Sequence, residues 1–273
     1  MQHDYAFSLP QPDAVSAAHS ERCADYIRAR IHDAGGSISF AEFMHYALYA
    51  PGLGYYAAGA CKFGADGDFV TAPEISPLFG RVVARQCAAA LRETENASVL
   101  EFGAGSGRLA LDMLRALREL DALPAEYRIL EVSADLRERQ QRLLREEVPE
   151  LADRIVWLDR MPDSHRGVVL ANEVLDALPV ERFMRRSNGV YQLRVCDEAG
   201  EFVFVDEPAP DVLVAAVEAI EQDVGRQLPD NYISEVSLAA PAWVGDVARM
   251  LESGLALLFD YGVSRREYYA ADR

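Results

Sequence analysis

The sequence predicts an α/β protein built on a Rossmann-like parallel sheet, and three observations support that prediction. Apolar segments of strand length alternate with amphipathic helical segments between residues 98 and 171. The connections between them are short, as they are where helices cross over between parallel strands. The first apolar segment, 98–102, runs directly into Gly103-Ala104-Gly105-Ser106-Gly107, a glycine-rich turn that lets a backbone approach a ligand closely.

Residues 1–92 are predicted to form a helical N-terminal region with a long loop. Ser39 is placed to cap the second of its helices. Residues 51–80 are rich in glycine, proline and aromatic side chains, which favours an ordered functional loop over regular elements. The expected helices are 20–34, 40–49 and about 78–92.

Residues 93–273 are predicted to hold the sheet, interrupted by an antiparallel β insertion at about 180–252. A buried strand is expected at 255–259, after the insertion. In the sheet we expect strands at 98–102, 127–131, 154–158 and 167–171, with helices at 106–119 and 134–146. In the insertion we expect strands at 181–195 and 201–205 and helices at 211–224 and 240–252.

Composition narrows the classes of protein. Half of the 273 residues are hydrophobic, enough for a globular core, and the formal charge of −17 argues against a nucleic-acid partner. The four cysteines lie far apart without a metal-binding spacing, so no metal site is expected. No apolar run reaches the roughly 18 residues of a membrane span. The polar start Met1-Gln2-His3-Asp4-Tyr5 does not resemble a secretory signal, so we expect a cytoplasmic protein.

The glycine-rich turn predicts a nucleotide-type cofactor other than a dinucleotide. A dinucleotide fingerprint has a third glycine where this chain has Arg108. Glu101, just before the turn, would repel a pyrophosphate but suits a ligand that carries an ammonium and a sulfonium. The pattern resembles motif I of class I S-adenosylmethionine methyltransferases. The alternative is an ordinary strand-to-helix turn without a ligand. The residues expected to bind the cofactor here are Glu101, Gly103, Ala104, Gly105 and Gly107.

The ends of the second and third strands supply further candidate cofactor contacts. Glu131 ends the strand at 127–131, where the second strand of a βαβ unit presents a carboxylate to a ribose, with Val132 beside it. Leu158 and Asp159, after the third strand, are candidates for an apolar wall and a polar contact to adenine. An exposed strand-end acid remains the alternative for Glu131.

The fourth strand ends in Asn172, Glu173 and Asp176, our candidate catalytic residues. Parallel α/β sheets bind ligands at the carboxyl ends of their strands. Methyl transfer is an in-line displacement, so the protein must align a nucleophile and manage one proton. Carboxylates suit a guanidinium acceptor, which they grip bidentately. The alternative is that Asn172 or Asp176 merely caps the following helix.

Five strings together resemble one family, the S-adenosylmethionine-dependent methyltransferases that include the mitochondrial complex I assembly-factor arginine methyltransferase and its bacterial relatives. They are residues 51–56, 67–80, 101–107, 172–179 and 260–262.

The resemblance implies a class I methyltransferase fold, S-adenosyl-L-methionine as cofactor and, from the mitochondrial member, symmetric dimethylation of an exposed arginine on a protein partner. It places residues 52–56 at the acceptor entrance. The family continues past residues 260–262, so the last two strands of its sheet are expected to be missing from this chain. The implied lid residues over the cofactor are Thr71, Pro73, Glu74 and Ser76.

Three other hypotheses stay open beside a protein arginine acceptor. The aromatic-rich loop also suits a flat small-molecule acceptor. A catalytically silent assembly protein that keeps the cofactor pocket is another hypothesis, and an NAD-linked dehydrogenase a distant one. An exposed strand at the edge of the sheet makes a homodimer possible.

Overall fold

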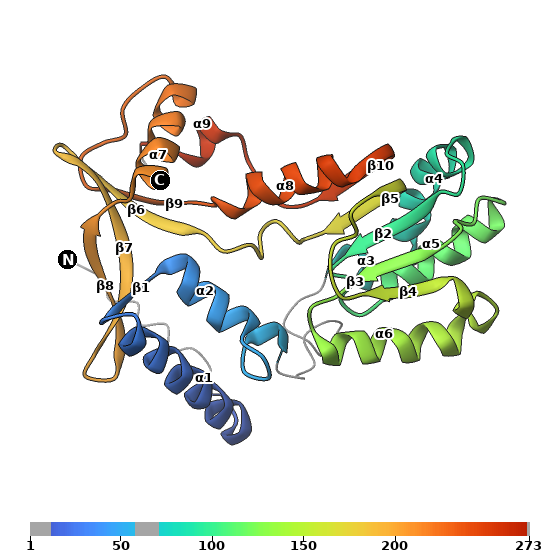
Figure 1. Ribbon diagram of the computed structural model, residues 1–273, viewed down its shortest axis with the longest axis horizontal. Coiled ribbons are helices and arrows are strands. Elements are labelled where there is room, and N and C mark those ends of the chain that lie inside the picture. The colour runs from blue at the N-terminus through green and yellow to red at the C-terminus, as the bar shows by residue number, and fades with distance from the viewer. Residues whose placement is uncertain (1–11, 58–70, 272–273) are drawn as a thin grey trace, which may run out of the picture.

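The computed structural model describes residues 12–57 and 71–271, which form an elongated molecule with a sheet at each end (Figure 1). A parallel sheet and an antiparallel sheet lie at opposite ends of the long axis, and the helix α2 (Phe40–Tyr49) crosses between them. No helix in these two ranges is long and apolar enough to cross a bilayer.

The parallel sheet has the strand order β10-β5-β2-β3-β4, and every neighbouring pair in it is parallel. All five residues of β2 are buried, as expected for a central strand that helices cover on both faces. The strands are β2 (Ser98–Phe102), β3 (Tyr127–Leu130), β4 (Ile155–Leu158), β5 (His165–Asn172) and β10 (Leu251–Phe259).

Helices cover both faces of this sheet. On one face α4, α5 and α6 pack over side chains such as Val99 and Val168. On the other face Trp243 and Val247 of α8 pack against Phe102 and Val169. The helices of this part are α3 (Ala72–Ile75), α4 (Pro77–Glu93), α5 (Arg108–Glu119), α6 (Ala134–Glu147) and α8 (Ala239–Met250), with a 3₁₀ turn at Pro149–Arg154.

The antiparallel sheet has the order β1-β7-β6-β9, with β8 paired to β7. Leu213 and Val217 of α7 pack on one of its faces against Phe183. Helices α1 and α2 lie over the other face, where Ile27 and Ile31 meet Val195. The elements are α1 (Ala14–Asp33), β1 (Ser37–Ser39), β6 (Glu181–Arg186), β7 (Gly189–Glu198), β8 (Glu201–Pro208), α7 (Asp211–Val224), β9 (Tyr232–Val236) and α9 (Arg265–Tyr268).

Most of the expected elements are confirmed, including the N-cap of α2. The Ser39 hydroxyl accepts from the Glu42 backbone N–H while the Glu42 carboxylate accepts from that of Ser39, a reciprocal capping box. Part of the 51–80 loop, residues 58–70, lies outside the described residues. Within the described part of the loop, the helix α3 was not expected.

Two expectations about strands were wrong. The segment 181–195 is a hairpin, β6 and β7, because Ser187 and Asn188 turn the chain between them. The strand expected to be buried at 255–259 lies at an edge of the sheet, so its residues alternate between half-buried and exposed. The short strand β9, which pairs with β6, was not expected at all.

Replacing Gly167 by alanine should destabilise the protein strongly. Gly167 lies at the amino end of β5 with φ +121°, and a Cβ there would meet the Ser98 carbonyl oxygen at 2.2 Å. Backbone atoms of a central strand cannot yield easily, so we expect a loss of about 3 kcal/mol in the free energy of unfolding. Gly200 also has a positive φ but open space around it. Gly200→Ala should cost only about 1 kcal/mol in the same urea titration, and equal losses would refute this account.

Candidate functional site

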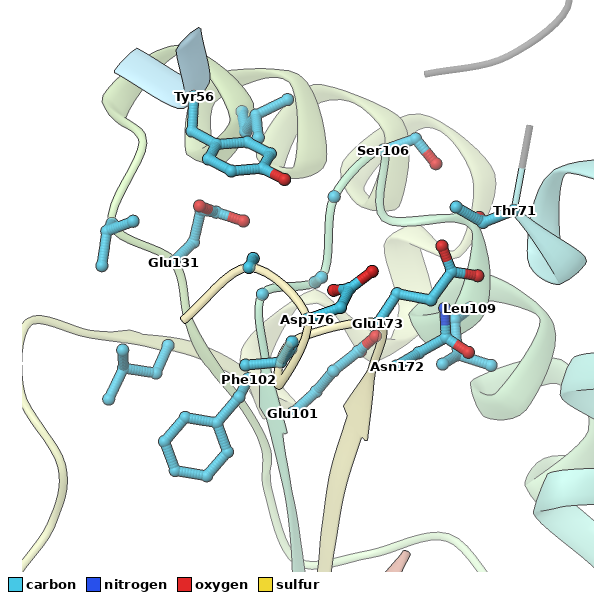
Figure 2. A pocket seen from close by; sticks show the side chains of 18 of the residues that line it. Tyr56, Thr71, Glu101, Phe102, Ser106, Leu109, Glu131, Asn172, Glu173 and Asp176 are labelled. Atoms are coloured by element: carbon cyan, nitrogen blue, oxygen red, sulfur yellow. The ribbon is translucent and has the colours of Figure 1, made fainter. Parts of the chain in front are cut away.

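A cavity of about 480 Å³ opens at the carboxyl ends of β2, β3 and β5. This volume lies in the usual range for a small-molecule site, and the position is the usual one for ligands of parallel α/β sheets. The end of α2 and the turn after it, the start of α3 and Trp243 of α8 complete the walls. Figure 2 shows carboxyl groups of Glu131, Glu173 and Asp176 turned into this space, with the Tyr56 ring above them.

The glycine-rich turn faces the cavity with its backbone. Gly103 and Gly105 have φ of +60° and +56°, values that L side chains adopt rarely. A Cβ on Gly103 would meet the Val174 side chain at 3.3 Å, so the turn and the loop after β5 pack closely. Helix α5 then begins at Arg108, so its first backbone N–H groups lie beside the cavity.

The buried amide of Gln140 holds the turn and the end of β3 together. Its Nε2 donates to the Gly105 carbonyl at 2.9 Å and to Glu131 Oε2 at 3.0 Å. Its Oε1 accepts from the Trp157 indole N–H at 3.0 Å. Glu131 Oε1 accepts from the Ser133 N–H at 3.0 Å, so the carboxylate is fixed from two sides at the cavity wall. Burial raises the pKa of Glu131, and these hydrogen bonds oppose the rise.

Glu101 is a buried carboxyl at the base of the cavity. The Tyr127 hydroxyl donates to its Oε2 at 2.7 Å. Removal from water raises the pKa of Glu101 to about 7, despite the opposing effect of that hydrogen bond. No ion pair among the described residues includes Glu101. The cavity therefore has a carboxyl at its base that a cationic ligand would ionise.

The loop after β5 is held by β10. Glu173 has φ +53°, and its N–H donates to the Phe259 carbonyl at 2.8 Å. Asp260 Oδ2 accepts from the N–H groups of Leu175 at 2.8 Å and Asp176 at 3.2 Å. Burial and neighbouring carboxylates raise the pKa values of Glu173 and Asp176. The structure thus brings these two predicted residues together on one restrained loop.

The N-terminal region supplies the wall opposite the glycine-rich turn. The Tyr49 hydroxyl donates to the Ala177 carbonyl at 2.7 Å, which ties α2 to the loop after β5. The Tyr49 ring stacks on that of Tyr56 with centroids 5.5 Å apart. Burial raises the pKa of Tyr56, as do the charges of Asp176 and Glu173. The end of the predicted acceptor segment, Tyr56, therefore lies over the cavity.

The start of α3 closes one side of the cavity. Thr71, Pro73 and Glu74, three of the predicted lid residues, line it, and the Glu74 carboxylate accepts a hydrogen bond from the Ser106 hydroxyl. This contact joins the lid segment to the glycine-rich turn. The other predicted residues that line the cavity are Glu101, Gly103, Ala104, Gly105, Glu131, Val132, Asn172, Glu173 and Asp176.

Four predicted residues do not line the cavity. Gly107 packs at the start of α5, where a Cβ would meet Gln140 Cγ at 3.3 Å. The Ser76 hydroxyl caps α4 by accepting from the Leu78 N–H. Leu158 packs in the core beneath α8, and Asp159 is exposed and pairs with Arg137 at 2.6 Å.

The sequence did not predict the two residues, Gln140 and Asp260, that position the cavity-lining segments by hydrogen bonds. Gln140 lies within a polar helix, where nothing local separates it from solvated neighbours. Asp260 was included in the resemblance but given no role. The strand-end position of Asp260 was the one available signal, because carboxyl ends of parallel strands share an edge.

Comparison with known proteins places the chain in a family. The model of the S-adenosyl-L-methionine-dependent methyltransferase family matches residues 82–273. The mitochondrial protein arginine methyltransferase NDUFAF7 of Danio rerio is 31% identical over 84% of this chain and 59% of that protein. The Drosophila melanogaster homologue is 32% identical over 92% of this chain and 63% of that protein.

Two crystal structures of Burkholderia thailandensis protein are also similar. One, bound to S-adenosyl-homocysteine, has a TM-score of 0.89 and 43% identity, covering 97% of this chain and 69% of that one. The other, in native form, has a TM-score of 0.85 and 42% identity, covering 96% and 67%. The chain therefore belongs to the S-adenosyl-L-methionine-dependent methyltransferase family, and it spans about three-fifths of the length of the curated relatives named above.

Glu101 should make the stability of the protein fall as the pH rises through neutrality. Its carboxyl titrates near 4.5 when exposed and near 7 in the folded protein, so the folded state binds more protons between these values. From pH 5 to pH 8, wild type should lose about 2 kcal/mol more than Glu101→Gln, which keeps an acceptor for Tyr127. Urea unfolding at several pH values measures this. Parallel pH curves for the two proteins would contradict the buried-carboxyl assignment.

Proposed function

We propose that this chain binds S-adenosyl-L-methionine in the cavity and transfers its methyl group to a guanidinium nitrogen of an arginine on a protein partner. One observation carries the proposal. The ionisable side chains that line the cavity include five carboxyl groups and, among the described residues, no arginine, lysine or histidine. Such a lining favours ligands that are positively charged. Both the sulfonium cofactor and an arginine acceptor are cations.

The residues present fit this cofactor. Glu131 is fixed by Ser133 and Gln140 with its carboxylate at the wall, where it would accept from the two hydroxyls of a ribose. Leu130, Val132 and Leu136 would give the adenosine half an apolar surface. Glu101 lies at the other end of the glycine-rich turn and would ionise beside the ammonium of the methionine half. The cavity volume of about 480 Å³ accommodates a ligand of this size.

When bound, the cofactor supplies a methyl group activated by its sulfonium. The chain must then hold and align the attacking nitrogen. Glu173 and Asp176 would grip the guanidinium by charge-assisted hydrogen bonds and direct one nitrogen to the methyl group. Methylation leaves that nitrogen with one proton to lose. The raised pKa values of Glu173 and Asp176 suit these carboxylates to accept it.

The assignment of the cofactor is tested by binding. Gly105→Val puts a side chain at a left-handed position beside the ligand, and Glu131→Ala removes the ribose acceptor. Each should weaken binding of S-adenosyl-L-methionine by about 100-fold in isothermal titration calorimetry, the loss expected for charge-assisted hydrogen bonds. Asp159→Ala is the matched control because its carboxylate pairs with Arg137 outside the cavity. Unchanged affinity in both test variants would refute the assignment.

The proposed catalytic roles of Glu173 and Asp176 can be tested separately from cofactor binding. Glu173→Gln and Asp176→Asn should each lower the rate of methyl transfer by about 100-fold while cofactor affinity changes little, since both groups would act on the acceptor. Labelled cofactor incubated with cell lysate and each variant measures transfer, followed by mass spectrometry for methylated arginine. Label that appears only in the low-mass fraction would instead support a small-molecule acceptor. Cofactor binding without any transfer would support a silent binding protein.

A further inference from the structure

The helix α2 packs its apolar side chains on the antiparallel sheet, yet several of them keep part of their surface exposed. Phe40, Phe43 and Ala47 follow one another at helical spacing, and none of the residues of α2 is fully buried. The helix runs from the antiparallel sheet toward the parallel sheet (Figure 1), and Leu48 and Tyr49 near its end line the cavity. Phe40 and Phe43 pack on Phe204 and Phe202 of β8, with ring centroids 5.7 and 5.3 Å apart, so only the part of each ring that stays exposed is available to a ligand.

A groove of about 390 Å³ lies along this face. Val180 and Glu235, from the start of β6 and from β9, form its opposite wall. The groove adjoins the cavity, because Met44, Leu48 and Asp176 line both. A ligand in the groove would therefore extend from the residue that we assign to grip the guanidinium.

The charge of the groove favours a basic ligand. Its two ionisable lining residues are both acidic, Asp176 at the junction with the cavity and Glu235 on the wall. Neither takes part in an ion pair between described residues. Glu235 Oε1 accepts from the Tyr268 hydroxyl, and the residue lines the groove. The guanidinium of Arg182 lies over the rings of Phe40 and Phe204, 5.6 and 4.6 Å from their centroids, so two acidic groups and one basic group lie at the groove and leave it with a net negative charge.

The length of the groove favours a peptide over a small molecule. The lining residues of α2, from Phe40 to Leu48, span about 12 Å along the helix axis, the reach of about four residues of extended chain. The lining of the groove changes along this length from the acidic side chain of Asp176 to the aromatic rings of Phe40 and Phe43. A small flat acceptor would need the cavity alone.

We propose that this groove binds the extended segment of the protein substrate that adjoins the methylated arginine. An apolar side chain of the segment packs on Phe40 and Phe43, and a second basic side chain pairs with Glu235. This inference rests on the proposed function, since it describes the acceptor of that reaction.

The test uses two fluorescent peptides and the intact protein saturated with S-adenosyl-homocysteine. The first has the sequence Gly-Ser-Arg-Gly-Leu-Gly-Arg-Ser, and the second replaces its leucine by serine and its second arginine by glutamine. Fluorescence polarisation should show the first peptide binding at least tenfold more tightly. Equal affinity for the two peptides, or no binding of either, would overturn the proposal.

Protein variants locate the effect. Glu235→Gln keeps an acceptor for Tyr268 and should reduce the tenfold preference to about twofold, whereas Glu218→Gln, an exposed acid on α7, should leave it unchanged. Ala47→Arg fills the groove and should weaken binding of the first peptide at least tenfold. An unchanged circular dichroism spectrum would show that this variant is folded. A preference that survives both Glu235→Gln and Ala47→Arg would place the peptide elsewhere and overturn the groove.

Failure of the proposed function looks different. If S-adenosyl-homocysteine itself does not bind, measured separately by calorimetry, the cofactor assignment fails before any peptide is added. If it binds and the peptides do not discriminate, only the groove fails.

Discussion

One half of the cavity, formed by the glycine-rich turn and the end of β3, depends on the buried amide of Gln140. All of its directional groups are engaged: the Gly105 carbonyl and Glu131 carboxylate accept from it, and the Trp157 indole donates to it. These partners come from the β2–α5 turn and the ends of β3 and β4. A buried amide that loses its hydrogen-bond partners costs free energy. The Gln140 side chain therefore opposes any displacement of these three segments relative to one another. The network also accounts for Gly107, since a side chain there would press on Gln140.

The half of the cavity beside the end of β5 depends in the same way on the carboxyl end of β10. Leu257 and Phe259 of this edge strand pack on the core, and Asp260 and the Phe259 carbonyl hold the loop that carries Glu173 and Asp176. Glu173 has a left-handed backbone, a conformation that persists only where its surroundings impose it. Restraint from β10 meets that requirement. The two halves of the cavity are therefore positioned by different strands, and close contact between Gly103 and Val174 joins them.

The fold was largely predictable because its central strands are apolar runs between amphipathic helices, a pattern that depends on local sequence. The strand β9 was not, since its five residues mix polar and apolar types and find their partner only in β6. Among the candidate site residues, those at strand ends such as Glu101, Glu131 and Glu173 follow from topology alone. The hydrogen bond from the Tyr49 hydroxyl to the Ala177 carbonyl could not be predicted. It joins residues 128 positions apart, and neither local sequence indicates the other as its partner. The sequence also did not indicate the direction of the Asp159 side chain, which forms an ion pair with Arg137.

The carboxyl groups that line the cavity affect both the stability of the protein and the charge of the ligands that it favours. Burial first, and neighbouring carboxylates second, raise the pKa values of Glu101, Glu173 and Asp176, so these groups carry an electrostatic cost that grows with pH. A cation that enters removes part of this cost, and it gains most where burial is deepest, at Glu101. A neutral or anionic ligand of the same shape would leave the cost in place. Under the proposed function, selectivity for positive charge would follow from acids that lack basic partners among the described residues of the cavity wall. The groove beside α2 is also net acidic, with Asp176 and Glu235 in its lining and the guanidinium of Arg182 over Phe40.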